Sequence, residues 1–199
     1  MTATILLIRH AAHAHLGQVL SGRRPGIALS PQGREQARRL AGFLADAPLA
    51  EVHTSPVQRA RETAEAVARP AAPSLVQAAL DEIDFGAWTG RPFAELEGDA
   101  AWRRWNADRG AAAPPDGESM AAAQRRAWDH VIDVAARHAG ATVAMVSHCD
   151  IIRAIVVQIL GLPLDAIFRF DIDPASVSRV AVGPWGAKVL SLNEGASRG

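Results

Sequence analysis

The chain has 199 residues, of which 49% are apolar and 21% are charged, and this composition is typical of a folded globular protein. Its 21 basic and 21 acidic residues cancel, which argues against broad electrostatic binding to nucleic acid or to a membrane surface. The single cysteine, Cys149, excludes an intramolecular disulfide, and no apolar run is long enough for a signal peptide or a membrane span. We therefore expect one cytoplasmic domain covering residues 1–199.

Two apolar runs each end on a histidine. Residues 4–8 lead into Arg9 and His10, and residues 142–147 lead into His148. Short apolar runs of this kind are typical of strands that are buried on both faces of a parallel sheet. Because the carboxyl ends of parallel strands meet at one edge of an open α/β sheet, we expect both histidines to lie at the same ligand-binding edge.

The first half of the chain alternates further strand and helix signals. A small, polar loop at about 11–30 is followed by Ser30-Pro31, which predicts a capped helix that ends near residue 46. A strand at 50–54 precedes Ser55-Pro56, which we interpret as a second cap, and a helix to about residue 68. Arg59 falls in the first turn of that helix, so it should lie at the same edge as the histidines.

The second half begins with an excursion between strands. We predict a covering insertion at about 83–117, weakly helical at 92–106, in which Trp102 and Trp105 act as anchors. Beyond it we expect two helices, at 119–138 and 150–160. We also expect three strands, at 167–171, 177–182 and 188–192. The pattern predicts an α/β protein, a three-layer α/β/α sandwich with a mostly parallel central sheet and an antiparallel addition at its end.

The residues that converge at the predicted edge suit phosphoryl transfer. Two arginines, Arg9 and Arg59, can bind a phosphate in bidentate fashion, and a neutral His10 can attack phosphorus. His148 can donate a hydrogen bond to the phosphoryl oxygens in the transition state, and Glu82 can protonate the leaving alkoxide. None of these steps needs a metal or a cofactor, and the sequence contains no clear metal motif.

Five motifs resemble those of the histidine phosphatase superfamily, in its phosphoglycerate mutase-like branch. They are Arg9-His10, residues 29–37, residues 55–64, residues 80–82 with 85–90, and Ser147-His148. The match runs from residue 4 to about residue 192, and five motifs in the right order are far more specific than one Arg-His pair. The resemblance implies a phosphoglycerate mutase-like fold, a phosphorylated His10, a phosphate pocket of Arg9, Arg59, His10 and His148, and Glu82 as proton donor.

The chain departs from this family in the loop after the nucleophile. Ala11 replaces the usual glycine, residues 12–15 read Ala-His-Ala-His where Glu-Thr and Trp-Asn often occur, and Cys149 replaces the usual glycine after the second histidine. We expect a differently shaped substrate pocket as a result. Its candidate substrate loop contains His13, Ser21, Gly22 and Arg23, and the roles of His13 and His15 stay open, as does any effect of the departures on activity.

The sequence thus predicts a metal-independent phosphomonoester hydrolase that acts through a phosphohistidine on a small phosphorylated metabolite. Two alternatives stay open: a phosphoglycerate mutase-type transferase, against which the short covering segment argues, and a catalytically weak module that binds a phospho-ligand or a protein. The sequence identifies neither the phosphomonoester nor the oligomeric state, with which a homodimer is compatible.

Overall fold

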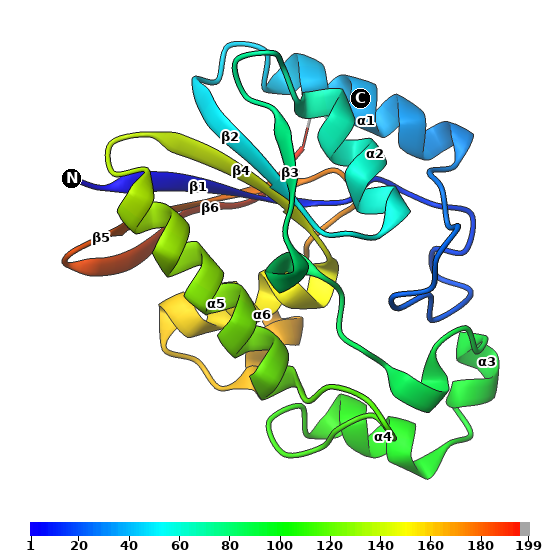
Figure 1. The fold of residues 1–199 in the computed structure, drawn as a ribbon. Helices are drawn as coiled ribbons and strands as arrows, with labels where there is room; N and C mark the ends of the chain where they lie inside the picture. Colours follow the sequence, from blue (N-terminus) through cyan, green and yellow to red (C-terminus); the bar gives the residue numbers. More distant parts are fainter. Residues whose placement is uncertain (196–199) are drawn as a thin grey trace.

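The computed structural model describes residues 1–195 and places a single twisted sheet between two layers of helices (Figure 1). The sheet order is β3-β2-β4-β1-β5-β6. The strands are β1 Ala3–Arg9, β2 Leu49–Thr54, β3 Ser74–Val76, β4 Thr142–Ser147, β5 Val177–Gly183 and β6 Gly186–Glu194. The first four strands in this numbering run parallel, β5 pairs antiparallel with β1, and β6 pairs antiparallel with β5. The predicted mostly parallel sheet with a late antiparallel addition is confirmed.

Each face of the sheet is covered by a pair of helices. The helices α1 Pro31–Phe43 and α2 Gln58–Val67 cover one face, and α5 Met120–Arg137 and α6 Cys149–Leu160 cover the other (Figure 1). Successive residues of β1 point to opposite faces, so Leu6 packs with the first pair and Leu7 with the second. β1 is therefore apolar at every position that it buries, and the predicted three-layer sandwich is confirmed.

The loop after His10 is pinned to the start of α1. The Ser30 hydroxyl caps α1 by accepting from the Gly33 amide at 3.0 Å, as the sequence predicts. A Cβ atom at Gly33 would lie 1.8 Å from the Ala12 carbonyl oxygen, so only glycine fits this approach. The Ala12 amide in turn donates to the Gln36 side chain at 2.9 Å. These contacts fix the backbone that follows the first histidine.

The segment predicted as a covering insertion contains two short helices, α3 Phe93–Leu96 and α4 Ala100–Ala107. The predicted helix at 92–106 is broken because Asp99 caps α4 through hydrogen bonds from the Ala101 and Trp102 amides. Trp88 packs edge-on against Trp102, with ring centroids 5.3 Å apart. The aromatic residues of this segment thus pack against one another and join the core on the α5/α6 side.

Two local predictions are wrong. Residues 167–171 form no strand, because Pro163 begins a 3-10 helix, η3 Leu164–Arg169, that buries Ala166 and Ile167. The signal at Ser55-Pro56 is not a helix cap, since α2 begins later, at Gln58. The sequence reasoning also missed β3, a short and largely exposed edge strand. No helix within the described residues is long and apolar enough to cross a membrane.

Candidate active site

The two histidines lie side by side at the carboxyl edge of the parallel strands. Arg9 pairs with Ser147 in the β1–β4 register, and the His10 amide donates to the Ser147 carbonyl at 2.9 Å. The ring centroids of His10 and His148 are 5.1 Å apart with an interplanar angle of 60°. Both side chains are buried. The structure thus brings together the pair that the sequence places at one sheet edge.

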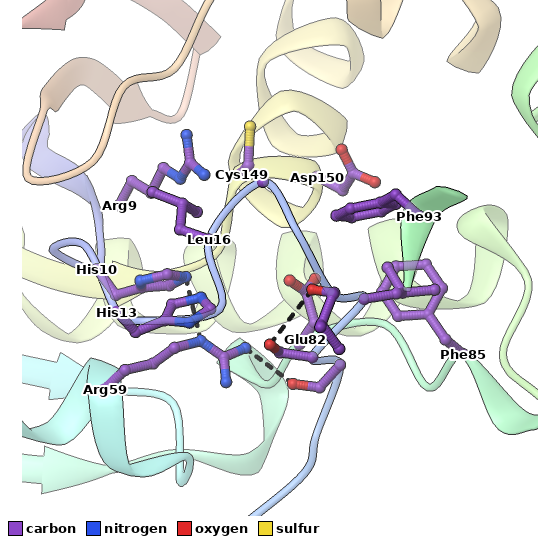
Figure 2. Close-up of a pocket in the computed structure, with 15 residues that line it drawn as sticks. Arg9, His10, His13, Leu16, Arg59, Glu82, Phe85, Phe93, Cys149 and Asp150 are labelled. Atoms are coloured by element: carbon purple, nitrogen blue, oxygen red, sulfur yellow. Dashed lines mark hydrogen bonds between the residues drawn. The ribbon is translucent and has the colours of Figure 1, made fainter. Parts of the chain in front are cut away.

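Hydrogen bonds present one nitrogen of His10 as a nucleophile. We assign the proton to Nδ1, because this atom lies 2.8 Å from the Ala11 carbonyl, which can only accept. Nε2 then carries the lone pair and accepts from Arg59 Nε at 3.2 Å (Figure 2). Burial, followed by the charges of Arg59 and Arg9, holds the pKa of His10 well below its usual value. His10 is therefore neutral at physiological pH.

Two guanidinium groups supply unpaired donors beside His10. Arg59 lies in the first turn of α2 and donates through Nη2 to the Gly22 carbonyl at 2.8 Å, while its Nη1 is buried without a partner among the described residues. Arg9 donates through Nη1 to the Ile172 carbonyl at 2.6 Å, and its Nε is likewise unpartnered within residues 1–195. In Figure 2, His10 lies between the two arginines. Buried unpaired cationic donors are costly unless an anion satisfies them.

A short hydrogen-bonded chain orients His148. Its Nε2 lies 2.9 Å from the Ser55 hydroxyl, which donates to Asp81 Oδ1 at 3.1 Å. Because the hydroxyl proton goes to the carboxylate, Nε2–H of His148 is the donor to Ser55, and Nδ1 keeps its lone pair. Nδ1 lies 3.2 Å from Arg59 Nη2. The sequence reasoning assigned Ser55 to a helix cap and missed this role, although the residue belongs to one of the five motifs.

Glu82 lies next to His148 on the segment that follows β3. Its Oε2 is 3.5 Å from His148 Nδ1, and its Oε1 accepts from the Ile83 amide at 3.0 Å. Burial, reinforced by the negative charge of Asp150, raises the pKa of Glu82 to about 7. A carboxyl group with this pKa can hold a proton at neutral pH and also release it, as a general acid and base must.

Arg9, His10, Arg59 and Glu82 line a cavity of about 140 Å³ that is open to solvent. His148 is fully buried and does not line it. Leu16, Leu20, Phe85 and Phe93 form its apolar walls, and Asp150 adds a carboxylate. Of the predicted substrate loop, His13, Ser21 and Gly22 line the cavity. Within residues 1–195, no three histidine, cysteine or carboxylate side chains are gathered as metal ligands.

Arg23, also predicted in the substrate loop, has a different position. Its Nε donates to the Glu82 carbonyl at 2.7 Å and its Nη2 to Glu118 at 2.8 Å. The guanidinium therefore holds the backbone beneath the candidate proton donor and does not line the cavity. The acidic residues that attract it lie far along the chain, so the loop sequence alone carried no signal of this pairing.

Comparison with known proteins identifies the family. The family model described as the histidine phosphatase superfamily (branch 1) matches residues 5–195. The chain belongs to this superfamily. The resemblance seen in the five motifs is therefore confirmed across nearly the whole sequence.

Several members of this superfamily are similar to the chain. A bifunctional protein of Mycobacterium tuberculosis is 36% identical over 196 residues, which cover 94% of this chain and 52% of that protein. Phosphoserine phosphatase 1 of Hydrogenobacter thermophilus is 30% identical over 95% of this chain and 91% of its own length. The crystal structure of the alpha-ribazole phosphatase from Shigella flexneri superposes with a TM-score of 0.86 at 25% identity, covering 98% of both chains. The chain spans about half the length of its mycobacterial relatives.

Proposed function

We propose that this histidine phosphatase is a phosphomonoester hydrolase that forms a phosphohistidine on His10 and uses no metal. The observation that carries this proposal is the neutral His10 Nε2 beside Arg59 and Arg9. Each of these arginines has one buried nitrogen without a partner within residues 1–195. A phosphate group would satisfy those donors and place its phosphorus next to the nucleophile. The arginines supply the positive charge that a metal provides in other phosphatases.

The first half of the reaction transfers the phosphoryl group to the enzyme. His10 Nε2 attacks phosphorus, an N–P bond forms, and the ester P–O bond breaks. Glu82 gives its proton to the departing alkoxide, which leaves as an alcohol. The Nδ1–H bond to the Ala11 carbonyl stabilises the positive charge that develops on the ring. The guanidinium of Arg59 stabilises the charge on the equatorial oxygens. His148 accepts from Arg59 Nη2 at its Nδ1 and so orients this guanidinium.

The second half returns the enzyme to its starting state. Glu82, now ionised, accepts a proton from a water molecule whose oxygen attacks phosphorus as the N–P bond breaks. Inorganic phosphate leaves, His10 recovers its lone pair, and Glu82 is protonated again. The net reaction is ester plus water to alcohol plus phosphate, and no redox partner or cofactor takes part.

The substrate class is a small phosphorylated metabolite. Relatives bear the names phosphoserine phosphatase and adenosylcobalamin/alpha-ribazole phosphatase, and the cavity that contains His10 is open to solvent. We also propose that residues 83–117 act as a cover, since Phe85 and Phe93 form part of the cavity wall. One domain over residues 1–199, a cytoplasmic location and a homodimer stay predictions.

A panel of phosphomonoesters assayed with a chelator tests the proposal. Phosphoserine, alpha-ribazole phosphate, nucleoside monophosphates and sugar phosphates should include at least one substrate, and the His10→Ala variant should hydrolyse none. Unchanged hydrolysis by His10→Ala would contradict the mechanism. One relative, from Bartonella bacilliformis, is named a phosphoglycerate mutase. Incubation with 3-phosphoglycerate and a bisphosphate primer distinguishes a mutase from a hydrolase, because a mutase yields 2-phosphoglycerate. Tight phosphate binding without any hydrolysis would favour the binding module.

A further inference from the structure

A third imidazole lies beside the nucleophile. The ring centroid of His13 is 5.4 Å from that of His10, and the side chain is only 7% exposed. Figure 2 shows the His13 ring next to His10 and facing the Arg59 guanidinium. The backbone of His13 is fixed by a β-bridge to Leu29 and by a hydrogen bond from the Leu16 amide at 3.1 Å. The backbone that carries this ring is therefore fixed before any ligand arrives.

Neither nitrogen of this ring makes a hydrogen bond to another described residue. Nδ1 of His13 is fully buried and unpartnered, as are Nη1 of Arg59 and Nε of Arg9. The three unpaired groups belong to residues that line one cavity. A buried imidazole without partners loses the hydrogen bonds that it makes in water, and an anion bound in this cavity could restore one of them.

The charge state of His13 suits it to donate one hydrogen bond. Burial, with the positive charge of Arg59, lowers the pKa of His13 to about 4. The ring is then neutral at physiological pH and carries one N–H and one lone pair. It could not add a third positive charge, but it could donate to an anionic oxygen. Its neighbour His15, with ring centroids 6.3 Å apart, does not line the cavity.

We propose that His13 is a catalytic residue that donates an N–H hydrogen bond to a non-bridging oxygen of the phosphoryl group. This inference rests on the proposed function for the identity of the anion. It adds a third imidazole to the pair formed by His10 and His148, and it gives a role to a loop in which the chain departs from its family. The contact should strengthen as negative charge builds on the phosphoryl oxygens in the transition state.

Anion binding tests the contact without requiring turnover. We would measure the affinity of the wild type, His13→Leu and His13→Asn for orthovanadate and inorganic phosphate by calorimetry at pH 7.5. Loss of one hydrogen bond to a charged oxygen should weaken vanadate binding about tenfold in His13→Leu. His13→Asn keeps an N–H donor at a similar distance from the backbone and should recover part of the loss. The matched control, His15→Leu, should bind vanadate like the wild type.

The outcomes separate this inference from the proposed function. Unchanged vanadate and phosphate affinity in a folded His13→Leu would overturn the inference, and so would a wild type that binds neither anion. A similar loss in His15→Leu would also overturn it, because the effect would then be structural. If the affinity for both anions depends on His13 but no phosphomonoester is hydrolysed, the inference stands and the proposed function fails. Thermal melting shows whether each variant is folded. If His13→Leu is not folded, the comparison is made between the wild type and His13→Asn.

Discussion

Burial favours the uncharged forms of both His10 and Glu82 at neutral pH, so the imidazole is deprotonated at Nε2 while the carboxyl group is protonated. It favours the uncharged form of each group, so it lowers the pKa of His10 and raises that of Glu82 to about 7. The nucleophile thereby keeps its lone pair, and the acid keeps its proton. The two states that the reaction needs at its start follow from one cause, the burial of these two side chains.

The raised pKa of Glu82 should make protein stability depend on pH. Because the folded-state pKa of about 7 exceeds the usual 4.5, the stabilising effect of the neutral form is complete below pH about 4.5 and is lost as pH rises through 7. Glu82→Gln stays neutral and should be more stable than the wild type at pH 8 by roughly 3 kcal/mol. The two proteins should differ little at pH 4.5. Urea unfolding at both pH values measures the difference, and an equal gap at both would contradict this reading.

At the scale of single elements, the delayed start of α2 has a functional consequence. Ser55 follows β2 directly, and because α2 begins only at Gln58, its hydroxyl is free to reach His148 and Asp81. The serine therefore fixes the tautomer and the orientation of the second histidine. It is a positioning residue, since it acts on the phosphoryl group only through His148.

Removal of that hydroxyl should impair turnover more than folding. Ser55→Ala leaves His148 Nε2–H without its acceptor, so kcat should fall roughly ten- to hundredfold with little change in KM. Ser55→Thr keeps a hydroxyl and should restore part of the rate. The control Ser119→Ala removes the cap of α5, which costs about 1 kcal/mol of stability but should leave kcat unchanged. Equal rates for wild type and Ser55→Ala would show that the tautomer is fixed in another way.

The start of α1 supports the nucleophile through Gly33. A methyl group at this position would meet the Ala12 carbonyl at 1.8 Å, two residues beyond His10, so the loop must move. Gly33→Ala should lower the free energy of unfolding by about 2 kcal/mol or more and reduce phosphate affinity. Gly42→Ala lies in the same helix with nothing within 4 Å and should be neutral or stabilise by up to about 1 kcal/mol. Chemical denaturation of both variants checks the contrast.

Over the whole molecule, the elements that the sequence predicted correctly are those with strong apolar patterns. The runs before His10 and His148 predicted two central strands, and their parallel pairing in the structure places both rings at one edge. The strand predicted at 167–171 was wrong because Pro163 favours a helical turn, which outweighs the apolar residues there. The edge strand β3 carries too short and exposed a pattern to be recognised.

The position of some candidate site residues could be predicted from the sequence, and that of others could not. Arg9, Arg59 and Glu82 stand in motifs, and the structure places all of them around the cavity with His10, while His148 is buried beside His10. The direction of Arg23 depends on acidic residues that only the folded chain brings near it. The packing of His13 against the nucleophile likewise depends on how the loop returns to Leu29. Local sequence patterns do not reveal contacts between side chains that are remote in sequence.

The central claim is that phosphorus passes through Nε2 of His10. Rapid mixing of enzyme with a ³²P-labelled substrate from the panel, followed by quenching in alkali, should trap up to one labelled phosphoryl group per chain. That label should be acid-labile and base-stable, map to the peptide that contains residue 10, and disappear in His10→Ala. Incorporation of label on any other residue, or multiple-turnover hydrolysis by His10→Ala, would contradict the account.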